Sequence, residues 1–175
     1  SVMKKISHLK TPSPVLGVFK IPKKIKTKPS LLTIAIDQLI DPGNMGSIIR
    51  LCDWFGVNEL VCSSDTVDCY NSKVIQSSMG SIARVRCNYQ PNLGDYLKSL
   101  EKPIFGASLN GKSIYNKKLP FKAIYVFGNE SNGISESINE ILDEKLTIPN
   151  QRLTNGANSL NVATSAAIFL SEIFR

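Results

Sequence analysis

A predicted helix start combines two glycines with an arginine, a pattern that could leave room for a bulky ligand. Pro42 and Gly43 favour a turn, and Asn44 is expected to cap the helix that follows. Helical side chains lean toward the N-terminus, so Arg50 is expected to project over Gly46, where no side chain obstructs a bulky ligand. A capped helix with a surface arginine is the plain structural alternative.

A loop with two glycines and one carboxylate follows a predicted buried strand. Gly128 allows close approach of the backbone to a ligand, and Gly133 supplies a position with positive φ before the next helix. Asn129 and Glu130 lie between the two glycines and carry polar groups of the loop. A tight turn with a solvated glutamate explains this segment equally well when it is taken alone.

A polar loop and an apolar helix close the sequence. The loop begins after Ile148, and Asn158 or Ser159 is expected to cap a helix that runs to about Phe174. Apolar residues lie on two faces of this helix, so we expect it to be buried on both sides. Small residues along the helix permit close packing and favour a subunit interface, with packing inside one core as the alternative.

The histidine and cysteine content limits the chemistry. The one histidine, His8, lies in a polar N-terminal stretch, which argues against Ser-His or Cys-His catalysis and against histidine-ligated metals within the domain. The four cysteines form no Cys-x-x-Cys pair and have no histidine nearby, so we predict core thiols and no metal site. Their positions are Cys52, Cys62, Cys69 and Cys87. Any general base must therefore be another residue type.

A phosphate-loop pattern occurs between Gly106 and Ser113, which match G-x-x-x-x-G-K-[ST] after a predicted strand. A working P-loop requires a helix to begin at the Lys-Ser pair, because its N-terminus helps to hold the phosphates. Pro120 follows Ser113 too soon for more than about two helical turns. A glycine turn at the carboxyl end of a strand is the favoured interpretation, and a P-loop nucleotide hydrolase is the lesser alternative.

Short apolar runs alternate with helical patterns from Leu31 onward, which predicts an α/β fold with a mostly parallel sheet flanked by helices. The predicted strands are Leu31–Ile36, Glu59–Cys62, Arg84–Tyr89, Pro103–Ala107, Ala123–Phe127 and Lys145–Ile148. The predicted helices are Asn44–Phe55, Ser72–Met79, Leu93–Leu100, Ser135–Leu142 and Ser159–Phe174. We assign residues 31–175 to one domain and residues 1–30, rich in proline and lysine, to a linker or extended arm.

The arm carries much of the net charge of +7. No acidic residue lies between Met3 and Ile36, and five lysines crowd one short stretch: Lys20, Lys23, Lys24, Lys26 and Lys28. A solvated linker and contact with nucleic acid are about equally good explanations of this charge. The sequence has no apolar run long enough to span a membrane and no signal-peptide pattern, so we expect a cytoplasmic protein.

Taken in order, the three segments resemble the signature of the SpoU family, the TrmH-like RNA 2′-O-ribose methyltransferases of the SPOUT superfamily. The family pattern N-x-G-x-x-x-R matches Asn44, Gly46 and Arg50. The pattern G-N-E-x-x-G matches residues 128–133, and S-L-N-V matches residues 159–162. The similarity covers the whole predicted domain.

The resemblance implies a C-terminal trefoil knot, S-adenosyl-L-methionine as cofactor, a homodimer, and methyl transfer to a ribose 2′-hydroxyl of tRNA or rRNA. On the matching positions it implies these catalytic residues: Arg50, Asn44, Glu130, Ser159 and Asn161. The implied cofactor contacts are Ser108, Gly128, Asn129, Ile148, Ser159 and Leu160. A knotted RNA-binding protein that has lost catalysis is the rival, and the intact Arg50 and Glu130 argue against it.

Arginine is an unusual group to activate a hydroxyl, because it normally stays protonated. In the mechanism proposed for the family, Arg50 is poised by the substrate phosphate and takes the proton of the ribose hydroxyl. In the alternative, Arg50 only clamps the phosphate and orients the sugar, and catalysis comes from proximity. The residue types alone leave both mechanisms open.

Two features depart from the family pattern. Asn155 stands where a glycine is usual in the loop before Ser159, and Gly156 follows it. Many relatives also carry an N-terminal RNA-binding domain that resembles a ribosomal protein. Residues 1–30 resemble only the tail of such a domain and its linker, so we expect the chain to be a catalytic fragment.

Neutralising the lysines of the arm tests the two explanations of its charge. If the arm binds phosphates, replacing the five clustered lysines by glutamine flattens the plot of the logarithm of the RNA binding constant against the logarithm of salt concentration. The slope changes by roughly 4 to 5 units, because each phosphate contact releases a counterion. The measurement is RNA affinity by filter binding over a series of salt concentrations. An unchanged slope would show that the arm is a solvated linker that does not bind phosphates.

Overall fold

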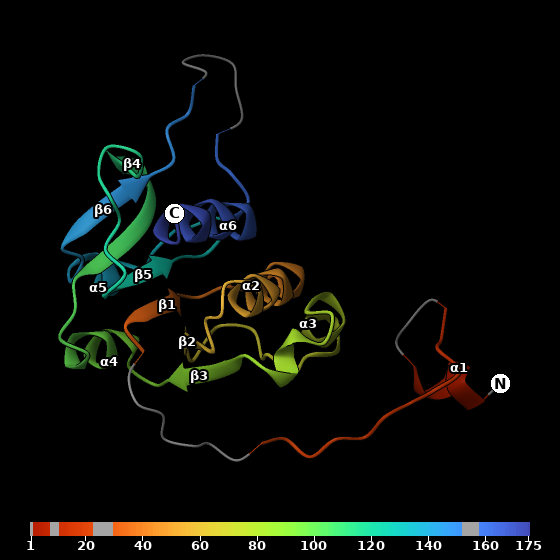
Figure 1. Ribbon diagram of the computed structural model, residues 1–175. Coiled ribbons are helices and arrows are strands. Elements are labelled where there is room, and N and C mark those ends of the chain that lie inside the picture. Colours follow the sequence, from red (N-terminus) through yellow and green to blue (C-terminus); the bar gives the residue numbers. More distant parts are fainter. Residues whose placement is uncertain (1, 8–10, 23–29, 152–157) are drawn as a thin grey trace.

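A parallel sheet forms the centre of the domain (Figure 1). The computed structural model describes residues 2–7, 11–22, 30–151 and 158–175, and within these ranges six strands pair in the order β3-β2-β1-β5-β4-β6. The strands are β1 (Leu32–Ile36), β2 (Glu59–Ser63), β3 (Arg86–Gln90), β4 (Ile104–Ser113), β5 (Ala123–Phe127) and β6 (Glu144–Thr147). All neighbours are parallel. Their carboxyl ends therefore share one edge, where α/β proteins commonly bind ligands.

Helices cover both faces of the sheet (Figure 1). The covering helices are α2 (Pro42–Trp54), α3 (Ser72–Ser77), the 3₁₀ helix η1 (Ser81–Ala83), α4 (Leu93–Ser99), α5 (Glu136–Asn139) and α6 (Val162–Ile173). The short helix α1 (Val2–Ile6) lies away from the sheet. The helices α2, α3 and α6 enclose the larger core, which includes Ile48, Val74 and Phe169. On the opposite face α4 and α5 enclose a smaller core with Leu97 and Ile138.

The fold class predicted from the sequence is confirmed. The strand predicted at Ala123–Phe127 has the predicted bounds, and all five of its residues are buried, as in a strand covered on both faces. β3 begins two residues later than predicted, because the N–H groups of Arg84 and Val85 both donate to the Ser81 carbonyl and so turn the chain. The trefoil knot stays a prediction.

The predicted cap of α2 is wrong, because Asp41 and not Asn44 occupies that position. Pro42 takes the first helical position, where its missing N–H costs nothing. The Asp41 carboxylate accepts a hydrogen bond from the Asn44 N–H at 2.7 Å. An Asp-Pro pair before a helical pattern is the sequence signal for this arrangement. The cap leaves the Asn44 side chain free for other contacts.

The P-loop interpretation is wrong. β4 continues through the glycine motif, and Lys112 and Ser113 pair with β6 instead of starting a helix. Residues 108–111 bulge out of the ladder between the two strands. A Cβ on Gly111 would lie 2.5 Å from the Lys145 carbonyl oxygen, so the close approach of β4 to β6 explains this glycine.

Gly46 serves helix packing and not ligand clearance. A Cβ at this position would overlap the Ser77 side chain and lie 2.8 Å from the backbone nitrogen of Ser78. The Ser77 hydroxyl donates to the Pro42 carbonyl at 3.0 Å, which fastens α3 to α2 where the two helices are in contact. The expectation that Gly46 leaves room for a ligand beneath Arg50 is therefore wrong.

The cysteines are thiols in or beside the larger core, as predicted. Cys52, Cys62 and Cys69 are buried, and Cys87 is half-buried. Burial raises the pKa of the Cys52 thiol to about 12, so it stays protonated at neutral pH. The described ranges hold no cluster of His, Cys, Asp and Glu suited to a metal ion, and none of their helices is long and apolar enough to cross a bilayer. His8 and four of the five clustered lysines of the arm lie outside the described residues.

Replacing Gly46 by alanine tests the packing of α2 on α3. Gly46→Ala is expected to lower the free energy of unfolding by about 1 to 3 kcal/mol, because a methyl group forces the two helices apart. Urea unfolding measures the change. The matched control is Gly94→Ala in α4, where an added Cβ meets only ordinary contacts of 3.6 to 3.8 Å. Equal stability of Gly46→Ala and the wild type would contradict this role.

Candidate active site

One hydrogen-bonded network joins residues from three distant parts of the sequence. The side-chain amide of Asn44, on α2, donates from Nδ2 to Glu130 Oε1 at 2.9 Å. The Nδ2 group of Asn161 donates to Asn44 Oδ1 at 2.8 Å. Asn44 accepts a hydrogen bond with Oδ1 and donates one with Nδ2. Hydrogen bonds are therefore donated in sequence from Asn161 to Asn44 and from Asn44 to Glu130. The structure thus brings together three of the five predicted catalytic residues.

Asn161 also caps α6. Its Oδ1 accepts hydrogen bonds from the N–H groups of the second and third helical residues at 2.9 and 3.2 Å. With Oδ1 held by the helix, the amide has only Nδ2 to offer to Asn44, so the cap orients the network. The predicted caps Asn158 and Ser159 are wrong, because α6 begins at Val162.

The side chain of Asn129 builds the loop after β5. Its Oδ1 accepts from the N–H groups of Ser131 and Asn132 at 2.9 and 3.1 Å. Its Nδ2 donates to the Gln38 carbonyl at 2.8 Å, which ties this loop to the end of β1. The backbones of Asn129 and Gly133 exchange two further hydrogen bonds. Asn129 therefore fixes the loop that presents the neighbouring carboxylate.

The two glycines of this loop meet different needs. A Cβ on Gly128 would overlap the Gly133 carbonyl and the Ile134 nitrogen, so the close approach at this position is to the chain's own backbone. Gly133 has φ +70°, the positive value predicted from the sequence. The tight turn that results places Glu130 within reach of Asn44.

Arg50 lies exposed on α2 and is not part of the network. Among the described residues it has no hydrogen-bond or ion-pair partner. Asp53, three residues later, is already occupied: the Arg84 guanidinium binds both of its oxygens at 2.7 to 3.0 Å, and the Ser81 hydroxyl donates at 2.7 Å. These bonds from Arg84 and Ser81 hold the pKa of Asp53 below its usual range. Arg50 is left available for an external anion.

The remaining predicted cofactor residues lie near the carboxyl edge of β4 and β6 and before α6. Ser108 begins the bulge in β4, and Ile148 follows β6 and is half-buried. Ser159 and Leu160 precede α6, and 48% of the Leu160 surface is exposed. Because β4, β5 and β6 are parallel neighbours, the ends of these strands face the same side as the loop after β5.

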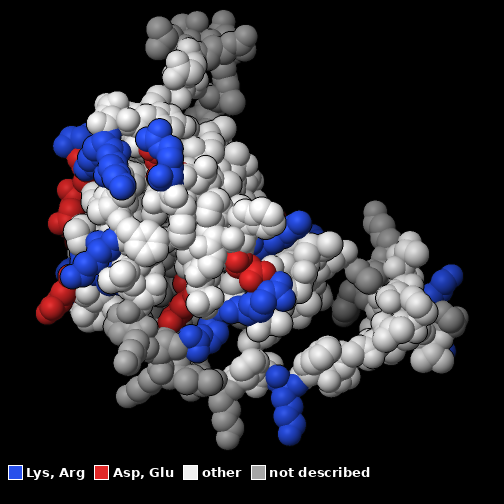
Figure 2. All heavy atoms as spheres, in the orientation of Figure 1, with Lys and Arg blue, Asp and Glu red and all other residues white. Residues whose placement is uncertain are grey.

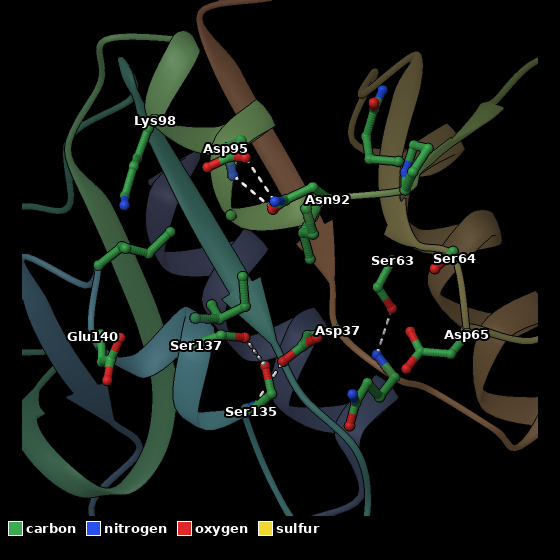
Figure 3. Close-up of a pocket in the computed structure, with 17 residues that line it drawn as sticks. Asp37, Ser63, Ser64, Asp65, Asn92, Asp95, Lys98, Ser135, Ser137 and Glu140 are labelled. Atoms are coloured by element: carbon green, nitrogen blue, oxygen red, sulfur yellow. Dashed lines mark hydrogen bonds between the residues drawn. The ribbon is translucent and has the colours of Figure 1, made fainter.

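A separate cavity of about 450 Å³ lies at the carboxyl ends of β1, β2 and β3 (Figure 3). Four carboxylates and one lysine line it: Asp37, Asp65, Asp95, Glu140 and Lys98. Asp37 is buried and accepts a hydrogen bond from the Ser135 N–H at 2.7 Å, a support of the loop after β5 that the sequence analysis missed. The excess of negative charge repels phosphates, so we exclude this cavity as an RNA site.

A model of the SpoU rRNA Methylase family matches residues 31–171, which contain the whole sheet and all three motifs. The chain belongs to this family. The resemblance inferred from the motifs is therefore confirmed. Asn155 and Gly156, where the sequence departs from the SpoU pattern, lie outside the described residues.

Two curated SpoU relatives are named as ribose methyltransferases. The chain is 32% identical over 173 residues to the 23S rRNA (guanosine(2553)-2'-O)-methyltransferase RlmP of Bacillus subtilis, covering 96% of this chain and 67% of the relative. It is 31% identical over 153 residues to the 23S rRNA (guanosine-2'-O-)-methyltransferase RlmB of Neisseria meningitidis, covering 85% of this chain and 60% of the relative. The chain thus spans roughly three fifths to two thirds of their length.

Solved structures have the same fold. A TrmH-family protein from Porphyromonas gingivalis gives a TM-score of 0.88 at 38% identity, over 98% of this chain and 70% of that chain. The SpoU methyltransferase AviRb from Streptomyces viridochromogenes, solved in complex with AdoMet, gives a TM-score of 0.73 at 28% identity, over 84% and 60%.

Two substitutions of Asn161 separate its cap from its bond to Asn44. Asn161→Ala removes both and is expected to lower the free energy of unfolding by about 1 kcal/mol. Asn161→Asp keeps a capping oxygen and loses the amide donor, so its stability is expected to stay near that of the wild type. Urea unfolding measures both. The capping role is refuted if the two variants are equally destabilised, or if the alanine variant loses nothing.

Proposed function

We propose that this chain carries the catalytic domain of an S-adenosylmethionine-dependent RNA methyltransferase that modifies a ribose 2′-hydroxyl of rRNA or tRNA. The observation that carries the proposal is the network from Asn161 through Asn44 to Glu130, with Arg50, on the same helix as Asn44, unpaired among the described residues. These four residues come from all three motifs. The relatives named above act on 23S rRNA, and AviRb was solved with AdoMet.

The residues present fit S-adenosylmethionine, which supplies a methyl group on a positively charged sulfur when it is bound. Glu130 gives the loop after β5 a negative charge, which favours a cationic ligand there. Ile148 and Leu160 offer apolar surface for the adenosine and methionine parts. The proposed cofactor contacts are Ser108, Gly128, Ile148, Ser159 and Leu160, with Asn129 next to Gly128 in the loop. Since Asn129 uses its side chain within the loop, we assign it a positioning role.

Arg50 is the proposed catalytic residue. The ribose hydroxyl is a very weak acid. The site must therefore orient the hydroxyl and receive its proton while its oxygen bonds to the methyl carbon and that carbon separates from sulfur. Because no carboxylate of the described ranges pairs with it, the Arg50 guanidinium is available to bind the phosphate of the target nucleotide through two N–H donors. In one mechanism Arg50 first releases a proton to solvent, and the neutral side chain then takes the proton of the hydroxyl. In the other mechanism the hydroxyl proton passes to solvent, and Arg50 only holds the sugar in place.

Ser159, Asn44, Glu130 and Asn161 complete the proposed catalytic group. The three network residues fix the direction of hydrogen bonding beside the reacting sugar, and Ser159 precedes them on the loop before α6. An intact network is the reason to prefer catalysis over an inactive knotted RNA-binding protein, because binding alone does not require these polar side chains to converge.

The oligomeric state and the cellular location are also proposed from the resemblance to the SpoU family. We expect a homodimer in which the outward face of α6 takes part, since Thr164 and Ala167 leave small side chains on it. We expect a trefoil knot in the C-terminal segment, no metal in the reaction, and action on RNA in the cytoplasm. Residues 1–30 are proposed to link this domain to an RNA-binding part.

Replacing Arg50 tests the proposed reaction. Arg50→Ala is expected to lower kcat/KM for methyl transfer by at least about 100-fold, because it removes both the phosphate clamp and the candidate base. The assay follows the radioactive methyl group from S-adenosylmethionine into rRNA or tRNA, and mass spectrometry of nucleosides identifies the product. The matched control is Arg86→Ala, which removes an exposed arginine on β3.

The outcome for Arg50→Ala is read together with cofactor binding. S-adenosylhomocysteine is expected to bind the variant as it binds the wild type, since Arg50 contacts the RNA. Methyl transfer near the wild-type rate would exclude both roles of Arg50. A pH–rate profile of the wild type separates them, because only a base mechanism requires the rate to follow the ionisation of Arg50.

A further inference from the structure

The single tryptophan of the chain is exposed to solvent. Trp54, the last residue of α2, is 85% exposed. Tryptophan side chains are highly buried on average, because their large apolar surface is costly to hydrate. The next residue, Phe55, does find a partner: its ring packs on Phe174 with centroids 5.3 Å apart. The exposure of Trp54 therefore points to a partner outside the described chain.

Trp54 shares the outward face of α2 with Arg50. Residues four apart on a helix are neighbours, and the side chain of Trp54 leans back toward the turn that holds Arg50. Ser47 and Asn44 continue this face toward the network and are half-buried. The helix rises about 15 Å from Asn44 to Trp54. That length suits several stacked nucleotides at about 3.4 Å each.

The charges beside the ring favour a nucleic acid over a second protein. Arg50 has no partner among the described residues. The side chain of Arg84 is 61% exposed and forms an ion pair with Asp53 on the side of the helix. Figure 2 shows basic side chains, with acidic atoms between them, over the part of the surface that α2 and α3 form. Protein interfaces are depleted of charge at their centre. A basic surface with an aromatic platform is the usual combination for single-stranded nucleic acids.

We propose that Trp54 stacks on a base of single-stranded RNA beside the nucleotide whose phosphate Arg50 holds. The inference rests on the proposed function, because it takes the substrate to be RNA. Bases that are unstacked in loops and ends commonly stack on aromatic side chains. Contact at Arg50 and at Trp54 fixes the position of the strand along α2. Trp54 thus selects an unpaired strand over a duplex, in which every base is already stacked.

The intrinsic fluorescence of the single tryptophan tests the proposal directly. Acrylamide quenching of the wild-type chain is measured with increasing amounts of an oligouridylate of about 10 nucleotides, and with a duplex of equal length. Saturating single-stranded RNA is expected to lower the quenching constant at least twofold, and the duplex is expected to leave it unchanged. Quenching that is unaltered at saturating oligouridylate overturns the proposal.

A second copy of the chain is the other occupant that the experiment detects. Quenching is measured without RNA over a range of protein concentrations. Protection of the tryptophan that grows with protein concentration alone assigns the ring to self-association and overturns the proposal. Quenching that is independent of protein concentration supports it.

Substitutions at Trp54 provide a second test of the proposal. Trp54→Ala is expected to weaken binding of oligouridylate at least about fivefold, because a base–aromatic stack is lost. Trp54→Phe keeps a smaller ring and is expected to restore part of the affinity. The matched control is Tyr115→Ala, which removes a half-exposed ring that follows β4. Equal affinities of Trp54→Ala and the wild type overturn the proposal.

Binding of S-adenosylhomocysteine and methyl transfer by the wild type are measured alongside. If the wild type methylates RNA and Trp54 stays exposed to acrylamide, only the stacking inference fails. If the wild type neither binds the cofactor product nor methylates RNA, the proposed function fails with it. Circular dichroism of each variant confirms that a loss of affinity does not come from unfolding.

Discussion

The side-chain amide of Asn44 holds the candidate site together, because it accepts one hydrogen bond and donates another to residues from two other parts of the chain. An amide can do this in only one orientation. Asn161 sets that orientation, since its own oxygen is held by the start of α6. Asp41 fixes the backbone of Asn44 at the start of α2. The carboxylate of Glu130 ends the network as its acceptor.

The parallel sheet makes this convergence possible. Strands that run the same way deliver their following loops to one edge, so segments that are 86 and 117 residues away from Asn44 meet beside it. The loops are then held rigid by local contacts. Asn129 ties the loop after β5 to the end of β1, and Gly128 lets that loop fold back on itself. Glycines that we attributed to ligand approach thus serve the chain's own packing first.

The elements of the fold could be predicted from the sequence better than the contacts of the site. β5 was predicted with its observed bounds, because a strand buried on both faces is a continuous apolar run. Asn44 and Asn161 were assigned to one site only through the family resemblance, since spacing along the chain carries no information about a contact of that range. The predicted helix caps were wrong where the sequence offers more than one capping residue within a few positions, as with Asp41 and Asn44. The choice among Asn158, Ser159 and Asn161 depends on the helix start, which is set by packing.

Hydrogen exchange with S-adenosylhomocysteine tests most directly whether the three motifs form one methyl-donor pocket. Bound S-adenosylhomocysteine is expected to slow exchange at the amides of residues 128–133, 148–151 and 159–161 together. No change is expected at the acidic cavity around Asp65 and Asp95. Protection confined to that cavity, or no protection in any of the three segments at saturating ligand, would contradict the account.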